Sequence, residues 1–159
     1  MVVGMMRTRR AGFSLIELVI VIAILGILAA VAVPRMSRGA AGATSSRLRA
    51  DLATMRSALE LYYAEHNNTY PAVADFENAL VNQFTDVDGN LNATKTGVFI
   101  YGPYLKEIPT IQVGAQKGNS GVAAADAAGV AWLYNATTGV ITANTGAATD
   151  DTGTLYSSY

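Results

Sequence analysis

Hydrophobic residues are concentrated in one run near the start of the chain. Residues 13–33 contain a single charged residue, Glu17, among mostly apolar side chains. A helix of this length extends roughly 30 Å, which is about the thickness of the hydrocarbon core of a bilayer. The pattern predicts a membrane-spanning helix over 13–34, and we expect the ring of Pro34 to kink it, because proline removes a backbone donor.

A second pattern follows, in which apolar residues recur every three or four positions along one helical face. The repeated positions are Leu48, Leu52, Met55, Leu59 and Tyr62. We expect this stripe to pack against a sheet of the same chain; a coiled coil with a partner is the alternative. The opposite face carries charges, including Arg56 and Glu60, which are spaced to pair. One long helix from Phe13 to about Ala64 is therefore predicted.

The remainder of the chain shows turn residues between short apolar runs. Pro71 ends the helix, and residues 75–80 indicate a short helix capped by Asp75. A strand is predicted at 97–101, and the segments 131–134 and 140–143 indicate a hairpin. The expected fold is α+β, with the long helix packed against a small antiparallel sheet.

These patterns divide the chain into four segments. Residues 1–12 form a short basic leader, 13–34 the membrane-spanning part of the helix, and 35–66 its amphipathic continuation. Residues 67–159 form a globular α+β part. Because basic residues flanking a membrane helix favour the cytoplasm, the arginines of the leader predict a cytoplasmic N-terminus and an exported C-terminal part.

Composition narrows the possible functions. The chain has no cysteine, which excludes disulfides and thiolate chemistry, and its net charge of −1 leaves no broad positive surface for nucleic acid. With one histidine and no recognisable nucleophile or phosphate-loop motif, the sequence lacks a catalytic constellation, so we do not expect an enzyme.

Glu17 is the most informative single residue. A carboxylate within a membrane helix costs at least about 2.5 kcal/mol unless it is paired or protonated. Either Glu17 lies close enough to the lipid headgroups to be solvated, or a partner neutralises it for a functional reason.

Residues 12–17, Gly-Phe-Ser-Leu-Ile-Glu, follow a basic leader and precede an apolar helix that ends at Pro34. This segment resembles the processing signal of type IV pilins and type II secretion pseudopilins. The resemblance implies that a prepilin peptidase cuts between Gly12 and Phe13 and methylates the new terminus at Phe13. It also implies that Glu17 meets the N-terminal ammonium of a neighbouring subunit in a filament.

Later segments resemble one branch of that family, the major pseudopilins of type II secretion. They are the Tyr70-Pro71 turn, residues 102–109 and the hairpin around Trp132. Residues 110–113 and an alanine- and glycine-rich insert at 114–130 depart from that pattern.

The implied function is a structural pseudopilus subunit in the bacterial inner membrane, which helps to export folded proteins. Its implied partners are copies of itself, the prepilin peptidase, minor pseudopilins and an inner-membrane secretion platform. Two alternatives stay open: a type IV pilus subunit for adhesion, motility or DNA uptake, and a membrane-anchored periplasmic binding module or enzyme.

The resemblance also implies a calcium ion in a C-terminal loop. Asp150 and Asp151 are the candidate ligands there. Asp86 and Asp88 are a weaker pair, because their loop begins like an EF-hand but lacks its later ligands.

Overall fold

The computed structural model describes residues 12–159, except for the side chains of residues 31–41. The chain divides into two compact units, with the boundary between Gly39 and Ala40, and each unit is described by itself. Residues 1–11 of the predicted leader lie outside the described residues.

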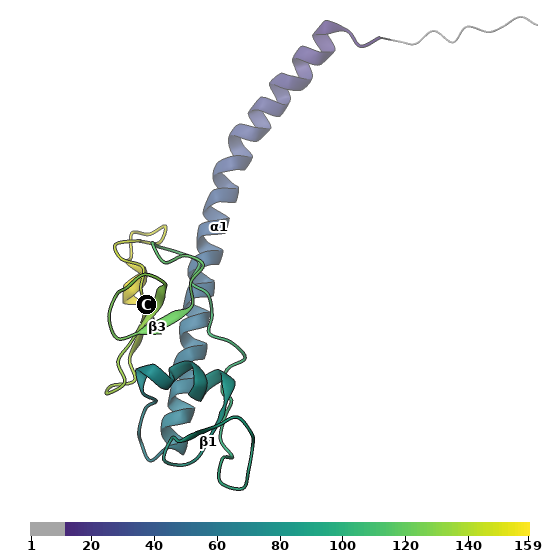
Figure 1. Ribbon diagram of the computed structural model, residues 1–159. Coiled ribbons are helices and arrows are strands. Elements are labelled where there is room, and N and C mark those ends of the chain that lie inside the picture. The colour runs from purple at the N-terminus through teal and green to yellow at the C-terminus, as the bar shows by residue number, and fades with distance from the viewer. Residues whose placement is uncertain (1–11) are drawn as a thin grey trace, which may run out of the picture. The chain divides into compact units, whose positions relative to one another are not determined.

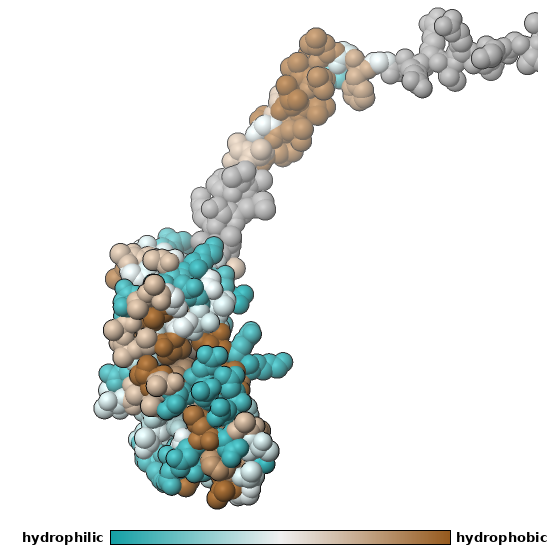
Figure 2. Space-filling model, in the orientation of Figure 1, coloured by the Kyte–Doolittle hydropathy of each residue, from teal (hydrophilic) through white to brown (hydrophobic). Residues whose placement is uncertain are grey.

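A single helix, α1, runs from Leu15 to Glu65 and confirms the long helix expected from the sequence (Figure 1). In the first unit its apolar side chains up to Leu28 are exposed, and they form the continuous apolar surface of Figure 2. Among the residues that the structure describes, no helical stretch meets the length and apolarity required to span a bilayer. The predicted span includes residues 31–34, whose side chains are outside the description. The predicted kink at Pro34 lies outside it as well.

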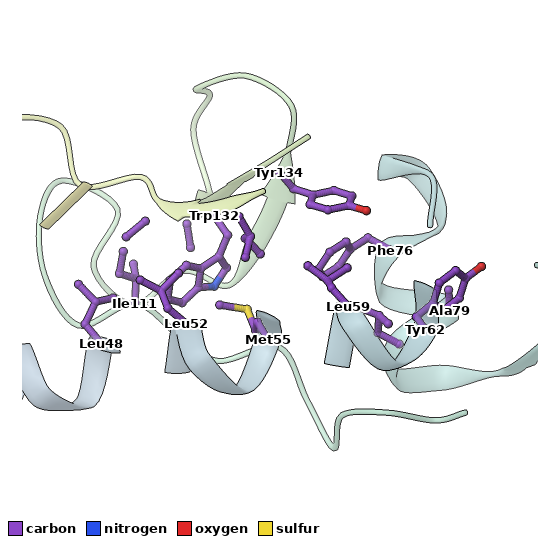
Figure 3. Packing of buried hydrophobic residues seen from close by; sticks show 14 of the residues in the cluster. Leu48, Leu52, Met55, Leu59, Tyr62, Phe76, Ala79, Ile111, Trp132 and Tyr134 are labelled. Carbon is purple, nitrogen blue, oxygen red and sulfur yellow. The ribbon is translucent and has the colours of Figure 1, made fainter. Parts of the chain in front are cut away.

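In the second unit, the predicted helical stripe forms the helix side of the hydrophobic core. All five stripe residues are at most 4% exposed. They pack against a cluster that includes Phe76, Ile111, Trp132, Tyr134 and Ile141 (Figure 3). Removing this apolar surface from water drives the second unit to fold onto α1, as the stripe predicted.

A three-stranded sheet covers this stripe. Its strands are β3 (Gly121–Ala123), β4 (Val130–Tyr134) and β5 (Ile141–Ala143), in the order β3-β4-β5. β4 and β5 form the predicted hairpin, with Trp132 opposite Ala143. β3 pairs parallel to β4, so the expectation of a purely antiparallel sheet is wrong at this edge. β3 comes from the alanine- and glycine-rich insert, whose composition carries no strand signal.

A second, smaller sheet pairs β1 (Phe84–Thr85) with β2 (Leu91–Asn92). The strand predicted at 97–101 is reduced to one bridge between Tyr101 and Thr85. The prediction fails because Val98 is 67% exposed and Ile100 46%, so no core surface holds this segment extended.

The short helix predicted at 75–80 is replaced by two short helical segments, η1 (Val73–Asp75) and η2 (Asn78–Asn82). Neither has a side-chain cap, so the capping role predicted for Asp75 is wrong. Phe76 and Leu80 are nevertheless both buried, as their spacing predicted. The last element is η3 (Tyr156–Ser158).

The charged face of α1 also differs from expectation. Arg56 does not pair with Glu60; it donates to the backbone oxygens of Ile141 and Tyr159. Glu60 accepts a hydrogen bond from the hydroxyl of Tyr70 instead. Tertiary partners therefore replace a local pair that contributes only a few tenths of a kcal/mol.

Candidate functional site

The start of α1 is built by a reciprocal pair of hydrogen bonds. The hydroxyl oxygen of Ser14 accepts a hydrogen bond from the N–H of Ile16 at 3.3 Å, and Oε2 of Glu17 accepts one from the N–H of Ser14 at 2.8 Å. The carbonyl of Ser14 accepts the first helical bond, from Leu18. This arrangement is a capping box in which the Ser14 oxygen is bound by the second rather than the third helical N–H, and it satisfies backbone donors that would otherwise lack partners at a helix start.

The capping box gives Glu17 a partner within its own chain, which the sequence analysis missed. The signal was present as Ser-x-x-Glu at 14–17, a pattern typical of helix N-termini. Among the described residues, the second carboxylate oxygen, Oε1, accepts no hydrogen bond. Glu17 thus combines a local structural role with an oxygen that can accept another donor.

The predicted cleavage point lies immediately before the capping box. Gly12 and Phe13 are outside the helix, and the side chain of Phe13 is 85% exposed. A peptidase requires an accessible, unwound backbone, because a helical segment presents its peptide groups to its own hydrogen bonds. The segment is therefore suited to cleavage between these two residues.

Around Glu17, α1 presents large apolar side chains without partners in the described structure. They are exposed by 44% or more and comprise Leu15, Ile16, Leu18, Val19, Ile20, Val21, Ile22, Ile24, Leu25, Ile27 and Leu28. Contiguous apolar surface of this kind marks a site of protein or membrane interaction. Glu17 is the only acidic residue within it.

The carboxylate of Asp150 is occupied by donors of the protein itself rather than left open to a metal ion. Oδ1 accepts hydrogen bonds from the N–H groups of Thr152 (2.8 Å) and Thr154 (2.9 Å) and from the hydroxyl of Thr152 (2.7 Å). Oδ2 accepts a short hydrogen bond from the hydroxyl of Tyr159. The Tyr159 hydroxyl, followed by that of Thr152, lowers the pKa of Asp150 well below its usual range.

Calcium binds six to eight oxygen ligands, whereas this carboxylate is surrounded by hydrogen-bond donors. Its neighbour Asp151 is exposed, and the part of the chain that the structure describes contains no group of three acidic or histidine side chains placed to hold a metal. The residues at Asp150 and Asp151 therefore do not fit the calcium site that the family resemblance implies.

The second pair of candidate ligands forms a self-contained turn. Asp86 accepts hydrogen bonds from the side chain of Asn90 (2.8 Å) and from the N–H groups of Asn90 and Asp88. These bonds, led by the side chain of Asn90, lower the pKa of Asp86. Asp88 accepts a hydrogen bond from the side chain of Asn67, and among the described residues neither aspartate belongs to a group of three side chains that could hold a metal.

The single histidine has a structural role. His66 is 2% exposed and stacks on the ring of Tyr62, with 3.7 Å between ring centroids. Its Nδ1 lies 2.7 Å from the carbonyl oxygen of Tyr62, so we assign the proton to Nδ1. Its Nε2 lies 2.8 Å from the hydroxyl of Thr85, which ties the end of α1 to β1.

Comparison with known proteins bears on the N-terminal segment and on about two thirds of the chain. Residues 7–33 match the prokaryotic N-terminal methylation motif. Type II secretion system core protein G of Aeromonas hydrophila is 33% identical over 105 residues, which cover 66% of this chain and 68% of that protein. No solved structure matches the chain. The chain belongs to the family of type II secretion system core protein G, the major pseudopilins, and carries their processing motif.

Proposed function

We propose that this chain is the structural subunit of a pseudopilus that helps to export folded proteins, and that it is not an enzyme. Residues 13–34 anchor it in the bacterial inner membrane, with the leader in the cytoplasm and the C-terminal part in the periplasm. A prepilin peptidase cuts after Gly12 and methylates Phe13. Copies of the processed chain then leave the bilayer and assemble side by side.

The observation that carries this proposal is the apolar surface between Leu15 and Leu28, which has no partner in the described structure. Such a surface is stable in lipid before assembly and against identical helices afterwards. Once the helix has left the lipid, apolar area that is not packed against neighbouring helices would face water at a cost of about 25 cal/mol per Å², which holds the assembled helices together. A repeated contact between unlike surfaces of identical subunits produces an open fibre.

Glu17 supplies the register of this assembly. Its Oε2 is bound to the N–H of Ser14, while Oε1 is available to the ammonium group that cleavage creates at Phe13 of a neighbouring subunit. An unpaired charge in a helix bundle costs several kcal/mol, and a paired one is tolerated. Subunits are therefore favoured at the one axial offset that brings the two charges together.

The match to core protein G supports a pseudopilus rather than a surface pilus for adhesion, motility or DNA uptake. Minor pseudopilins and an inner-membrane secretion platform are the proposed partners in this assembly. Both would contact the folded second unit or the apolar part of α1, since these are the surfaces through which the subunit meets other proteins.

Mass spectrometry of the full chain extracted from membranes tests the processing step. The expected protein lacks the first 12 residues and carries one methyl group on the amine of Phe13. Expression in a strain without the peptidase is the control and should give the intact N-terminus. An unprocessed chain in the peptidase-positive strain would overturn the proposal.

Exchange of residues 1–35 for an unrelated membrane anchor tests the assembly step. A subunit that assembles through α1 should lose filaments and secretion, although its second unit stays folded and membrane-attached. A periplasmic binding module or enzyme on a tether would keep its full function after the exchange. Filament counts by electron microscopy, together with secretion of a folded cargo, separate the two outcomes.

A further inference from the structure

The segment from Asp150 to Tyr159 is folded back onto α1 at two arginines. Arg49 and Arg56 are seven residues apart, which places them two turns apart on one helical face. Arg56 donates to the backbone oxygen of Tyr159 at 2.8 Å and to that of Ile141 at 3.1 Å. The guanidinium of Arg49 lies 4.1 Å from the centroid of the Tyr159 ring, in a cation–π contact.

Tyr159 also reaches back to the start of the same segment. Its hydroxyl donates to Oδ2 of Asp150, and its ring makes an edge-on contact with Tyr156 at 5.6 Å. Nη2 of Arg49 lies 3.7 Å from Oδ2 of Asp150, whose side chain is only 3% exposed. Tyr159 is thus bound through its ring, its hydroxyl and its backbone oxygen.

Both oxygens of Asp150 are occupied within this arrangement. Three donors bind Oδ1, and Oδ2 receives the hydroxyl of Tyr159 with the guanidinium of Arg49 nearby. A carboxylate offers about four acceptor positions, so little capacity is left for a metal. The positive charge of Arg49 also opposes a divalent cation at this place.

We propose that this chain closes its C-terminal segment with Tyr159, held by Arg49, Arg56 and Asp150, in place of a bound calcium ion. The closure satisfies the Asp150 carboxylate with protein donors, where a calcium-dependent loop would satisfy it with the metal. Hydrogen bonds to an ionised carboxylate are about twice as strong as neutral ones, which makes such a closure self-sufficient. The second unit should therefore reach its full stability without calcium.

The test is thermal unfolding of the full chain in detergent, followed by the fluorescence of Trp132. This residue is the one tryptophan of the sequence and is completely buried, so its emission reports on the second unit. Saturating calcium chloride and a calcium chelator should give melting temperatures within about 1 °C of each other, because no ligand binds preferentially to the folded state.

The variant Tyr159→Phe removes the hydroxyl and keeps the ring, and it should lower the melting temperature by roughly 3 °C or more. Arg49→Gln should lower it as well, because the cation–π contact and the ion pair are lost. Asp151→Asn is the matched control, since it removes a neighbouring carboxylate that is exposed, and it should leave the melting temperature unchanged.

A rise of several degrees on adding calcium to the wild-type chain would overturn the proposal, whatever the variants do. A melting temperature of the Tyr159→Phe variant equal to that of the wild type would overturn it as well. If a variant does not fold, the calcium comparison on the wild-type chain still decides the question.

Discussion

The backbone N–H of Ser14 donates a hydrogen bond to Oε2 of Glu17 at 2.8 Å, so the single acidic residue of the apolar segment between Leu15 and Leu28 is engaged within its own chain. The bond lies directly after the predicted cleavage point. Glu17 therefore has two roles to separate: stabilising the start of α1, and pairing with a neighbouring subunit.

The variant Glu17→Gln separates these two roles. Glutamine retains the oxygen that caps the helix but carries no charge. We expect normal membrane insertion and a normal helix start, together with loss of filaments, because the neighbour's ammonium would then have no counter-charge. Electron microscopy of sheared filaments measures the result, and Glu17→Val, which loses both roles, is the comparison. Wild-type filament yield from Glu17→Gln would show that capping, rather than charge, is what assembly requires.

The variant Ser14→Ala tests the capping box itself. Loss of an N-cap side chain costs about 0.5–2 kcal/mol of helix stability, and the N–H of Ile16 loses its acceptor. Amide hydrogen exchange in detergent micelles should therefore become faster over the first turn of α1 and stay unchanged in the second unit. Ser14→Asp keeps an acceptor at the cap and should exchange like the wild type. Equal exchange rates in all three proteins would contradict the capping role.

Two leucines of α1 give a matched pair for the core. Leu52 is 1% exposed and packs in the cluster with Trp132, whereas Leu61 is 51% exposed. Leu52→Ala should lower the free energy of unfolding by about 2–5 kcal/mol, because it leaves a cavity in the core. Leu61→Ala should change it by less than about 0.5 kcal/mol. Denaturant unfolding followed by Trp132 fluorescence measures both changes. Similar losses would contradict the placement of Leu52 on the buried face of α1 and Leu61 on the exposed face.

A buried tyrosine, Tyr134, and a partly buried one, Tyr104, predict a loss of stability in alkali. Burial, followed by the neighbouring carboxylate of Glu65, raises the pKa of Tyr104, and burial raises that of Tyr134. Because both pKa values are raised above the unfolded value of about 10, the stability that these two tyrosines contribute should be constant below pH about 10 and fall as the pH rises further.

Phenolate absorbance during an alkaline titration measures this effect. Part of the tyrosine signal should appear only when Trp132 fluorescence reports unfolding. Tyr104→Phe should reduce that late fraction, and its hydroxyl contact with Glu65 at 2.6 Å would be lost. A single early titration of all the tyrosines, with the fold intact, would be the contrary result.

The sequence alone determined the features that depend on local order. The processing motif, the apolar run and the stripe from Leu48 to Tyr62 are read along one helix, where neighbours in sequence are neighbours in space. For this reason α1, its buried face and the β4–β5 hairpin were predicted correctly. The capping box at Ser14 and Glu17 could also have been predicted, since its four-residue pattern is local.

Only the tertiary structure decided the features that join distant residues. Asp150 was placed in a calcium loop, yet its carboxylate contacts Tyr159 and Arg49. His66 is likewise buried by packing against Tyr62 and Thr85, and Thr85 comes from a separate element, β1. Donor and acceptor roles at such positions depend on which side chain arrives from elsewhere in the chain, and no local pattern carries that information.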